Sequence, residues 1–422
     1  MTTHKFTKNS NLLMSFFIAN NIAKKTHITK STTNIFKSLY ENIYDAYEYL
    51  QHLKKTSNIQ IDIKQIESVS QVPKPKHFNS NSFPASIRKH IDENMMCEII
   101  YTFSLFERKI NVIFVTEDPN TELKISVYNK YMERIILWLY ILNEYSSKQC
   151  SQQLTVYLYF TSLVKELPKT NIEILNEHHV NTAFTSTCQI DSEIVVFRKE
   201  EWFKVLMHET FHNFGLDFSD MNTDECTRKI LSMFPVNSKV NLYESYTEFW
   251  AEIMNALFCS FFLLEDKKDV KTFMKNAELF IYYERNNSLF QLVKVLDFMG
   301  LKYENLYSNK NGSALLRNTL YKEQTSVLAY YVIKTILLTK YQSFLLWCEN
   351  KHFSLLQFKK TATHQREFCE FIEKNYKNTD MLQGIYNAEF VIDKLKKVNQ
   401  KSKKKAFEFL AHNMRMSVCE LL

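Results

Sequence analysis

The centre of the chain reads Val205-Leu206-Met207-His208-Glu209-Thr210-Phe211-His212-Asn213-Phe214-Gly215, a run whose pattern predicts a helix. Residues four apart lie on one face of a helix, so His208 and His212 can offer two imidazole nitrogens to a single metal ion. Glu209 follows His208 directly and can reach a water molecule on that ion without binding the ion. Two neutral ligands, a carboxylate base and an open coordination position are the components of a zinc hydrolase site.

The segments on either side predict how this helix begins and ends. Glu193–Phe197 (EIVVF) has the composition of a strand and leads almost directly into the helix. The acidic pair Glu200 and Glu201 suits the positive N-terminal end of a helix. Gly215, one of only four glycines in the 422 residues, lies where a helix would end in a left-handed cap.

Segments further upstream predict the rest of a small mixed β-sheet. Glu98–Phe103 and Lys109–Thr116 are rich in Ile, Val, Phe and Tyr and flank a short charged turn, which predicts a hairpin. The apolar residues of Tyr128–Leu142 have helical spacing, and those of Leu154–Phe160 alternate as in a strand. We therefore expect all the strands in the first half of the chain.

Downstream of the metal-binding helix the sequence predicts helices only. Long helical patterns cover residues 241–264, 323–349 and 386–412. Three of the six prolines fall within residues 71–84, which predicts a linker or surface loop. The expected fold class is α+β, and its parts are an N-terminal helical region with linker (1–84), a catalytic domain with the small mixed sheet and the metal-binding helix (85–265), and a large all-helical C-terminal lobe (266–422).

A zinc site needs a third protein ligand, and one arrangement lies directly after the helix. His212 to Gly215 forms the H-x-x-G part of the pattern H-E-x-x-H-x-x-G-x-x-H. The position that should then bind the metal is Phe218, whose side chain has no ligand atom. Asp217 is one residue out of step, which makes it a candidate for orienting a ligand or for capping the helix.

The other arrangement takes a glutamate from a later helix. The helix predicted over residues 241–264 carries Glu244, Glu248 and Glu252 on one face. Like charges four residues apart repel each other, and a bound cation would relieve the repulsion. Asn241 and Glu244 have the spacing of a capping box, which leaves Glu248 as the favoured ligand. Glu252 would hydrogen-bond a ligating histidine, and Glu244 and Glu252 stay open as alternative ligands.

These motifs resemble those of zincin metallopeptidases of the gluzincin kind. The resemblance lies in HETFH (208–212) and in the downstream E-x-x-A-E of Glu248–Glu252, where the family more often has Asp in the final position. The wider stretch 181–252 is similar to proteins of large DNA viruses that are identified as metallopeptidases from their sequences. The bias of the chain toward Lys, Asn, Ile, Phe and Tyr agrees with that source.

The resemblance implies a zincin-like catalytic region and hydrolysis of peptide bonds in a protein or peptide substrate. One Zn²⁺ per chain would be held by His208, His212 and Glu248, with Glu209 as the general base. A rival interpretation is a structural or virion-assembly protein that binds zinc and cleaves nothing. The presence of Glu209 weighs against it, because a degenerate peptidase commonly loses the general base first.

The same resemblance implies a substrate strand and an oxyanion stabiliser. Zincins usually run the substrate along an edge strand beside the metal-binding helix, which would be Glu193–Phe197 here. A Tyr or His often stabilises the oxyanion, and the candidates are Tyr243, Tyr246, His178 and His179. Packing and surface positions are the commoner role of such residues.

Composition sets the remaining expectations. Seven lysines fall within Lys394–Lys405, which predicts a solvated helix face or tail and leaves a nucleic-acid or membrane-surface contact as the weaker alternative. The eight cysteines form no C-x-x-C pair and are expected to be reduced thiols of an intracellular protein, in the cytoplasm of a cell or host or in a virion. The apolar run 327–338 is interrupted by Lys334 and is too short to span a bilayer, so we expect no membrane span.

Overall fold

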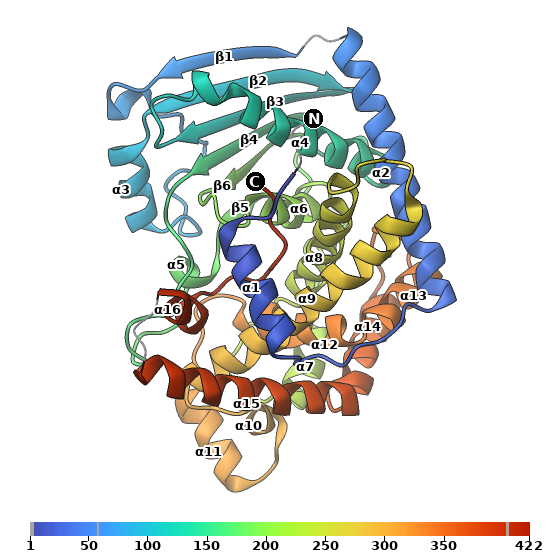
Figure 1. The fold of residues 1–422 in the computed structure, drawn as a ribbon. Coiled ribbons are helices and arrows are strands. Elements are labelled where there is room, and N and C mark those ends of the chain that lie inside the picture. The colour runs from blue at the N-terminus through green and yellow to red at the C-terminus, as the bar shows by residue number, and fades with distance from the viewer. Residues whose placement is uncertain (1–3, 57–58, 402–404) are drawn as a thin grey trace. The chain divides into compact units, whose positions relative to one another are not determined.

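The structure, a computed structural model, describes residues 4–56, 59–401 and 405–422 (Figure 1). Two compact units interleave along the chain. A sheet unit comprises residues 38–164 and 181–220, and a helical unit comprises residues 1–37, 165–180 and 221–422. The sequence predicted consecutive parts instead, with boundaries near residues 84 and 265.

One six-stranded mixed sheet forms the sheet unit, with the strand order β1-β2-β3-β4-β6-β5. The strands β1 and β5 form the two edges of the sheet, and β2, β3, β4 and β6 lie between them. The pairs β3/β4 and β4/β6 are parallel, and the other three pairs are antiparallel. The bounds are Gln60–Gln65 (β1), Cys97–Leu105 (β2), Arg108–Thr116 (β3), Gln153–Phe160 (β4), Ala183–Thr185 (β5) and Asp191–Val196 (β6). The predicted hairpin and the strands predicted near residues 154–160 and 193–197 are confirmed.

Alternate residues of the central strands face two different helical layers, as the two-residue period of a strand requires. Ile113 and Val115 of β3 belong to a buried cluster with α3 (Ala85–Asn94). Phe114, between them, points to the opposite face, where its ring lies 5.2 Å from that of Tyr128 in α4 (Ile125–Tyr145). The sheet is thus covered on both faces.

The helix α6 (Trp202–Asn213), which carries the His-Glu-x-x-His motif, follows β6 and packs against β5 and β6. Its side chains are buried along its whole length. In α4, Trp138 donates a hydrogen bond of 2.8 Å from Nε1 to Thr210 Oγ1 of α6. The sheet and α4 together therefore hold the motif in a fixed, buried position.

The helical unit contains no strand among the residues that the structure describes, as the sequence predicted for the region after Gly215. A π-helical turn, Leu328–Ile333, leads into α12. The helices are α1 (Lys8–Ala19), the start of α2 (Lys30–Thr56), α5 (Glu177–Val180), α7 (Asp224–Met233), α8 (Leu242–Phe262), α9 (Val270–Phe298), α10 (Tyr303–Tyr307), α11 (Asn311–Leu320), α12 (Lys334–Thr339), α13 (Tyr341–Lys351), α14 (Ala362–Asn375), α15 (Thr379–Lys401) and α16 (Lys405–His412).

Residues 413–422 lie along the polar side of α9. The buried carboxylate of Glu284 accepts hydrogen bonds from the backbone N–H groups of Val418 and Cys419, at 2.8 and 2.9 Å. Asn287 donates to the carbonyl of Met416 at 3.0 Å. This segment satisfies polar groups that would otherwise be buried in the core without partners.

None of the helices in the described ranges has the length and apolar character needed to cross a bilayer, in agreement with the prediction of no membrane span.

Candidate metal centre

The end of α6 has the cap that the sequence predicted. Gly215 has a φ of 66°, in the left-handed region. Its N–H donates to the carbonyl of His212 at 3.0 Å, and the N–H of Leu216 donates to that of Phe211 at 2.9 Å. This pair of bonds is a Schellman motif, which ends the helix at Asn213 and places the capping glycine three residues after the second histidine.

The two histidines face each other across one turn of α6. The Nε2 atoms of His208 and His212 lie 3.2 Å apart, and the ring planes are inclined by 75°. Both side chains are buried. Two nitrogens bound tetrahedrally to zinc, each at 2.0–2.1 Å, would lie about 3.3 Å apart. The spacing of the pair therefore fits two ligands of one zinc ion.

Asp217 fixes the orientation of His212. Its Oδ2 lies 2.6 Å from His212 Nδ1, and the aspartate is fully buried. With Nδ1–H donating to this carboxylate, Nε2 keeps its lone pair for a metal ion. Ser219 donates from Oγ to the second carboxylate oxygen at 3.0 Å. Asp217 thus contacts one of the two histidines of the motif, and its role in orienting a metal ligand stays a prediction.

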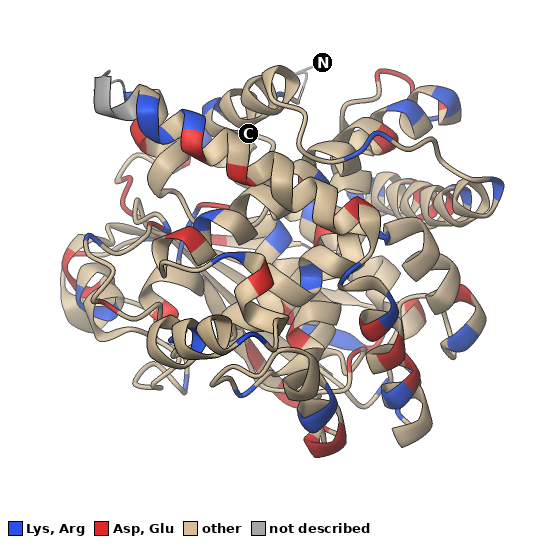
Figure 2. Cartoon of the chain, turned by 90° about the horizontal axis from the view of Figure 1, so that it is seen from below, with Lys and Arg blue, Asp and Glu red and all other residues tan. Residues whose placement is uncertain are grey.

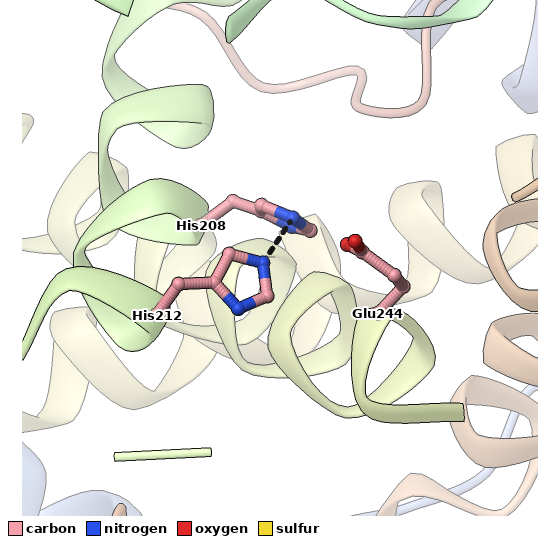
Figure 3. Close-up of side chains that lie close together, drawn as sticks. All are labelled: His208, His212 and Glu244. Carbon is pink, nitrogen blue, oxygen red and sulfur yellow. Dashed lines mark hydrogen bonds between the residues drawn. The ribbon is translucent and has the colours of Figure 1, made fainter. Parts of the chain in front are cut away.

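Three residues form a group that could hold a metal ion: His208, His212 and Glu244. One ligand atom of each lies within 4.8 Å of the others (Figure 3). The carboxylate of Glu244 also accepts a hydrogen bond from Tyr330 Oη at 2.9 Å. Two imidazoles and one carboxylate are a donor set that zinc commonly takes in proteins.

The capping box expected at the start of α8 is wrong. Asn241 has a φ of 42° and makes no side-chain capping bond. Its amide donates to Ser326 Oγ at 3.0 Å instead. The reason for setting Glu244 aside as a ligand is thereby removed. Glu248, the ligand favoured from the sequence, is buried one turn further along α8, and its role as a ligand stays a prediction.

Glu252 has a different partner from the one expected. Its Oε1 accepts a hydrogen bond of 2.5 Å from Lys334 Nζ, and both side chains are buried. The residue that orients a histidine is Asp217, so the expectation for Glu252 is corrected. The sequence did contain a sign of this ion pair, because Lys334 interrupts an apolar run and a buried lysine requires a partner.

The substrate strand expected from the sequence is also corrected. The strand that contains Glu193–Val196 is β6, which is paired on both sides, with β4 and with β5. The edge beside it is β5, a strand of three residues. Among the oxyanion candidates, Tyr246 donates from Oη to the carbonyl of Leu356 at 2.9 Å and serves packing within the helical unit. For Tyr243, His178 and His179, a role in stabilising the oxyanion stays a prediction.

Two of the eight cysteines form a disulfide, Cys150–Cys188, so the expectation of eight reduced thiols is wrong. The two residues are separated by 38 positions and meet at Gly215. A Cβ atom on that glycine would lie 3.4 Å from Cys188 Cβ and 3.5 Å from Cys150 Sγ. The other six cysteines are free and buried. Spacing in the sequence holds no sign of this pair, because only the fold brings the two loops together.

The lysine-rich segment Lys394–Lys405 is described only in part, since residues 402–404 lie outside the described ranges. Within α15, Lys396 forms an ion pair with Asp297 at 2.6 Å. In α15 the acidic residues Asp380, Glu389 and Asp393 all precede Lys394; Figure 2 colours the charged positions of the chain. A nucleic-acid partner for the segment stays a prediction.

No protein-family model, no curated protein and no solved structure matches the chain. The resemblance to gluzincins therefore rests on the two sequence motifs alone.

Proposed function

We propose that the protein is a zinc-dependent metallopeptidase of the gluzincin kind. The observation that carries the proposal is the 3.2 Å separation of His208 Nε2 and His212 Nε2, with Glu209 between them on the same buried helix. Two ring nitrogens that face each other in this way compete for one proton in the absence of a cation. A shared metal ion removes that conflict, because both lone pairs can point at it.

Glu244 is the third ligand in this proposal, because its carboxylate belongs to the same group of ligand atoms. Glu248 is the alternative. With either glutamate, three protein ligands leave the fourth tetrahedral position open, which is the difference between catalytic and structural zinc sites.

The residues of the chain divide the catalytic work. A zinc ion bound in an open site supplies Lewis acidity toward a carbonyl oxygen and lowers the pKa of water. Glu209 would take the proton of the attacking water and deliver it to the leaving amine. Asp217 would hold His212 in the tautomer that keeps Nε2 available. Burial of Glu209 and of the two histidines excludes bulk water from the proton transfer.

Metal analysis of the purified protein is the first test. We expect about one zinc per chain, as three protein ligands on one ion imply, and a large loss of zinc in His212→Ala and Glu244→Gln. Glu248→Gln, one turn along the same helix, is the matched control and should keep the metal. Loss in Glu248→Gln with retention in Glu244→Gln would exchange the two glutamates in the proposal. A wild-type protein that holds no zinc after refolding with it would refute the proposal.

Activity is then measured on an unstructured protein such as casein and on a library of fluorogenic peptides. Glu209→Gln should keep the zinc and lower the rate by about 10²–10⁴-fold, the usual contribution of a general base. Glu93→Gln, a surface glutamate of α3, is the control and should change neither property. Zinc binding without cleavage of any substrate, in the wild type and in Glu209→Gln alike, would favour the rival interpretation of a silent zinc protein.

A further inference from the structure

We propose that the Cys150–Cys188 disulfide sets the metal affinity of the histidine pair through a chain of hydrogen bonds, in which Thr187 and Ser219 are positioning residues for His212. The inference rests on the proposed zinc site and concerns its regulation. Every residue in it belongs to the sheet unit.

Four side chains form the chain of hydrogen bonds. Thr187 Oγ1 lies 3.0 Å from Ser219 Oγ, and Ser219 Oγ lies 3.0 Å from Asp217 Oδ1. Asp217 Oδ2 lies 2.6 Å from His212 Nδ1. A serine hydroxyl has one proton, and Ser219 gives it to the carboxylate, so Thr187 must be the donor to Ser219. Each carboxylate oxygen of Asp217 thus has its own donor, which fixes the plane of the carboxylate and the ring of His212.

The disulfide holds the first residue of this chain in place. Cys188 follows Thr187 directly and has a φ of 47°, a left-handed conformation that a residue with a side chain adopts only when its surroundings impose it. Its N–H donates to the carbonyl of Asn213 at 3.1 Å, at the end of α6. The sulfur atoms pack against Gly215. The covalent bond to Cys150 therefore determines where Thr187 lies relative to the end of the metal-binding helix.

The residue next to Cys150, the other cysteine of the disulfide, also contacts the C-terminal end of α6. Ser151, next to Cys150, donates from Oγ to Asn213 Oδ1 at 2.5 Å. Asn213 in turn donates from Nδ2 to Thr185 Oγ1 at 2.9 Å. Loops from both cysteines thus meet at Asn213, the residue after His212. Breaking the bond between them would loosen both loops at that point.

A dithiol reductant can reach this bond. Cys188 is exposed to solvent, whereas Cys150 is 1 % exposed. A thiolate of the reductant would bond to Cys188 Sγ and displace Cys150 as a thiolate, and the second thiol of the reductant would then displace Cys188. The products are two cysteine thiols and a cyclic disulfide, so two electrons and two protons pass to the chain. Thr187 can then leave Ser219, and the Ser219 hydroxyl that donates to Asp217 loses the hydrogen bond that holds it in place.

The test is the affinity for Zn²⁺ in competition with a chromophoric chelator. The samples are the oxidised wild type, the wild type reduced with dithiothreitol and desalted without oxygen, the double variant Cys150→Ser/Cys188→Ser, Thr187→Val and Thr187→Ser. We expect reduction, the double variant and Thr187→Val each to weaken zinc binding by about 10-fold, the lower end of the usual effect of removing a partner of a metal ligand. Thr187→Ser keeps the hydroxyl and should bind as the wild type does.

Two controls separate this effect from general damage. Cys97→Ser changes a buried free thiol of the same unit, and Thr102→Val removes an exposed hydroxyl of the sheet. Both should bind zinc with wild-type affinity. If the double variant does not fold, Thr187→Val still tests the hydrogen bonds with the disulfide intact.

The outcomes distinguish the two proposals. Equal zinc affinity in the oxidised, reduced and Thr187→Val proteins would overturn this inference and leave the proposed function standing. Absence of zinc binding in the oxidised wild type would refute the proposed function itself. Weakening by Thr187→Val together with full affinity in Thr187→Ser would support the inference, because a merely structural role of this loop would not depend on the hydroxyl.

Discussion

Two features of Gly215 disfavour a side chain at this position: its left-handed backbone conformation and its contact with the Cys150–Cys188 disulfide. Its φ of 66° strains any residue with a side chain, and the disulfide lies against it. We expect Gly215→Ala to lower the free energy of unfolding by about 1–2 kcal/mol, the cost of a left-handed conformation with a Cβ atom. Urea denaturation checks this value.

Gly312 supplies the matched control for that substitution. It lies near the start of α11 with open space around the position of a Cβ atom. Gly312→Ala should be neutral or should raise the free energy of unfolding, by up to about 1 kcal/mol. An equal loss in both variants would show that the cap at Gly215 is not under strain.

His352 predicts how the stability of the protein depends on pH. Burial, and then the neighbouring His364, lower the pKa of His352 to about 3. The folded protein keeps this ring neutral, whereas the unfolded chain protonates it near pH 6.5. The stability that depends on the neutral ring is therefore complete above pH 6.5 and is lost as the pH falls from 6.5 toward 3.

Denaturation of the metal-free protein at a series of pH values measures this loss. His352→Phe keeps an aromatic ring and should flatten the decline between pH 6.5 and 4, whatever its effect at neutral pH. His27→Phe, a substitution of an exposed histidine, should leave the decline unchanged. If the stability of His352→Phe falls with pH as steeply as that of the wild type, groups other than His352 cause the decline.

At the scale of elements, α8 and α12 are joined by the buried ion pair of Glu252 and Lys334. Removing one partner leaves a buried charge without compensation, so Glu252→Leu or Lys334→Met alone should destabilise the protein by about 3–5 kcal/mol. The double variant should recover most of that loss, because two apolar side chains replace both charges. Zinc content should be the same in all three variants, and a loss of zinc in Glu252→Leu would restore the role in the metal site that the sequence suggested.

The elements that could be predicted from the sequence are those whose own side chains define them. The strands β2, β3, β4 and β6 bury apolar residues, and α6 has both a helical pattern and a glycine at its end. The edge strands β1 and β5 were not predicted. In β1 most side chains are exposed, and β5 has three residues, so backbone pairing with β2 and β6 rather than burial defines them.

The same limit applies to the metal site. His208, Glu209 and His212 are close in sequence, and one helical turn is enough to bring them together. The choice between Glu244 and Glu248 depends on how two helices lie in space, and the supposed capping box at Asn241 misdirected it. The pairing of Cys150 with Cys188 has no local pattern at all.

At the scale of the whole molecule, a metal that binds only the folded state must stabilise it. We expect zinc at about 100 times its dissociation constant to raise the free energy of unfolding by about 2.7 kcal/mol, and a chelator to reverse the effect. Thermal unfolding followed by circular dichroism measures both changes. Magnesium should have no effect, and His212→Ala should lose the response to zinc; a response retained in that variant would place the bound zinc elsewhere.

The position of residues 413–422 along α9 has a consequence for the synthesis of the protein. The hydrogen-bond partners of Glu284 lie at positions 417–419, so they are synthesised more than a hundred residues after Glu284 itself. By then every residue of the sheet unit has been translated. A nascent chain that stalls before these positions would contain the whole sheet unit, while the carboxylate of Glu284 would still lack the partners it has in the finished helical unit.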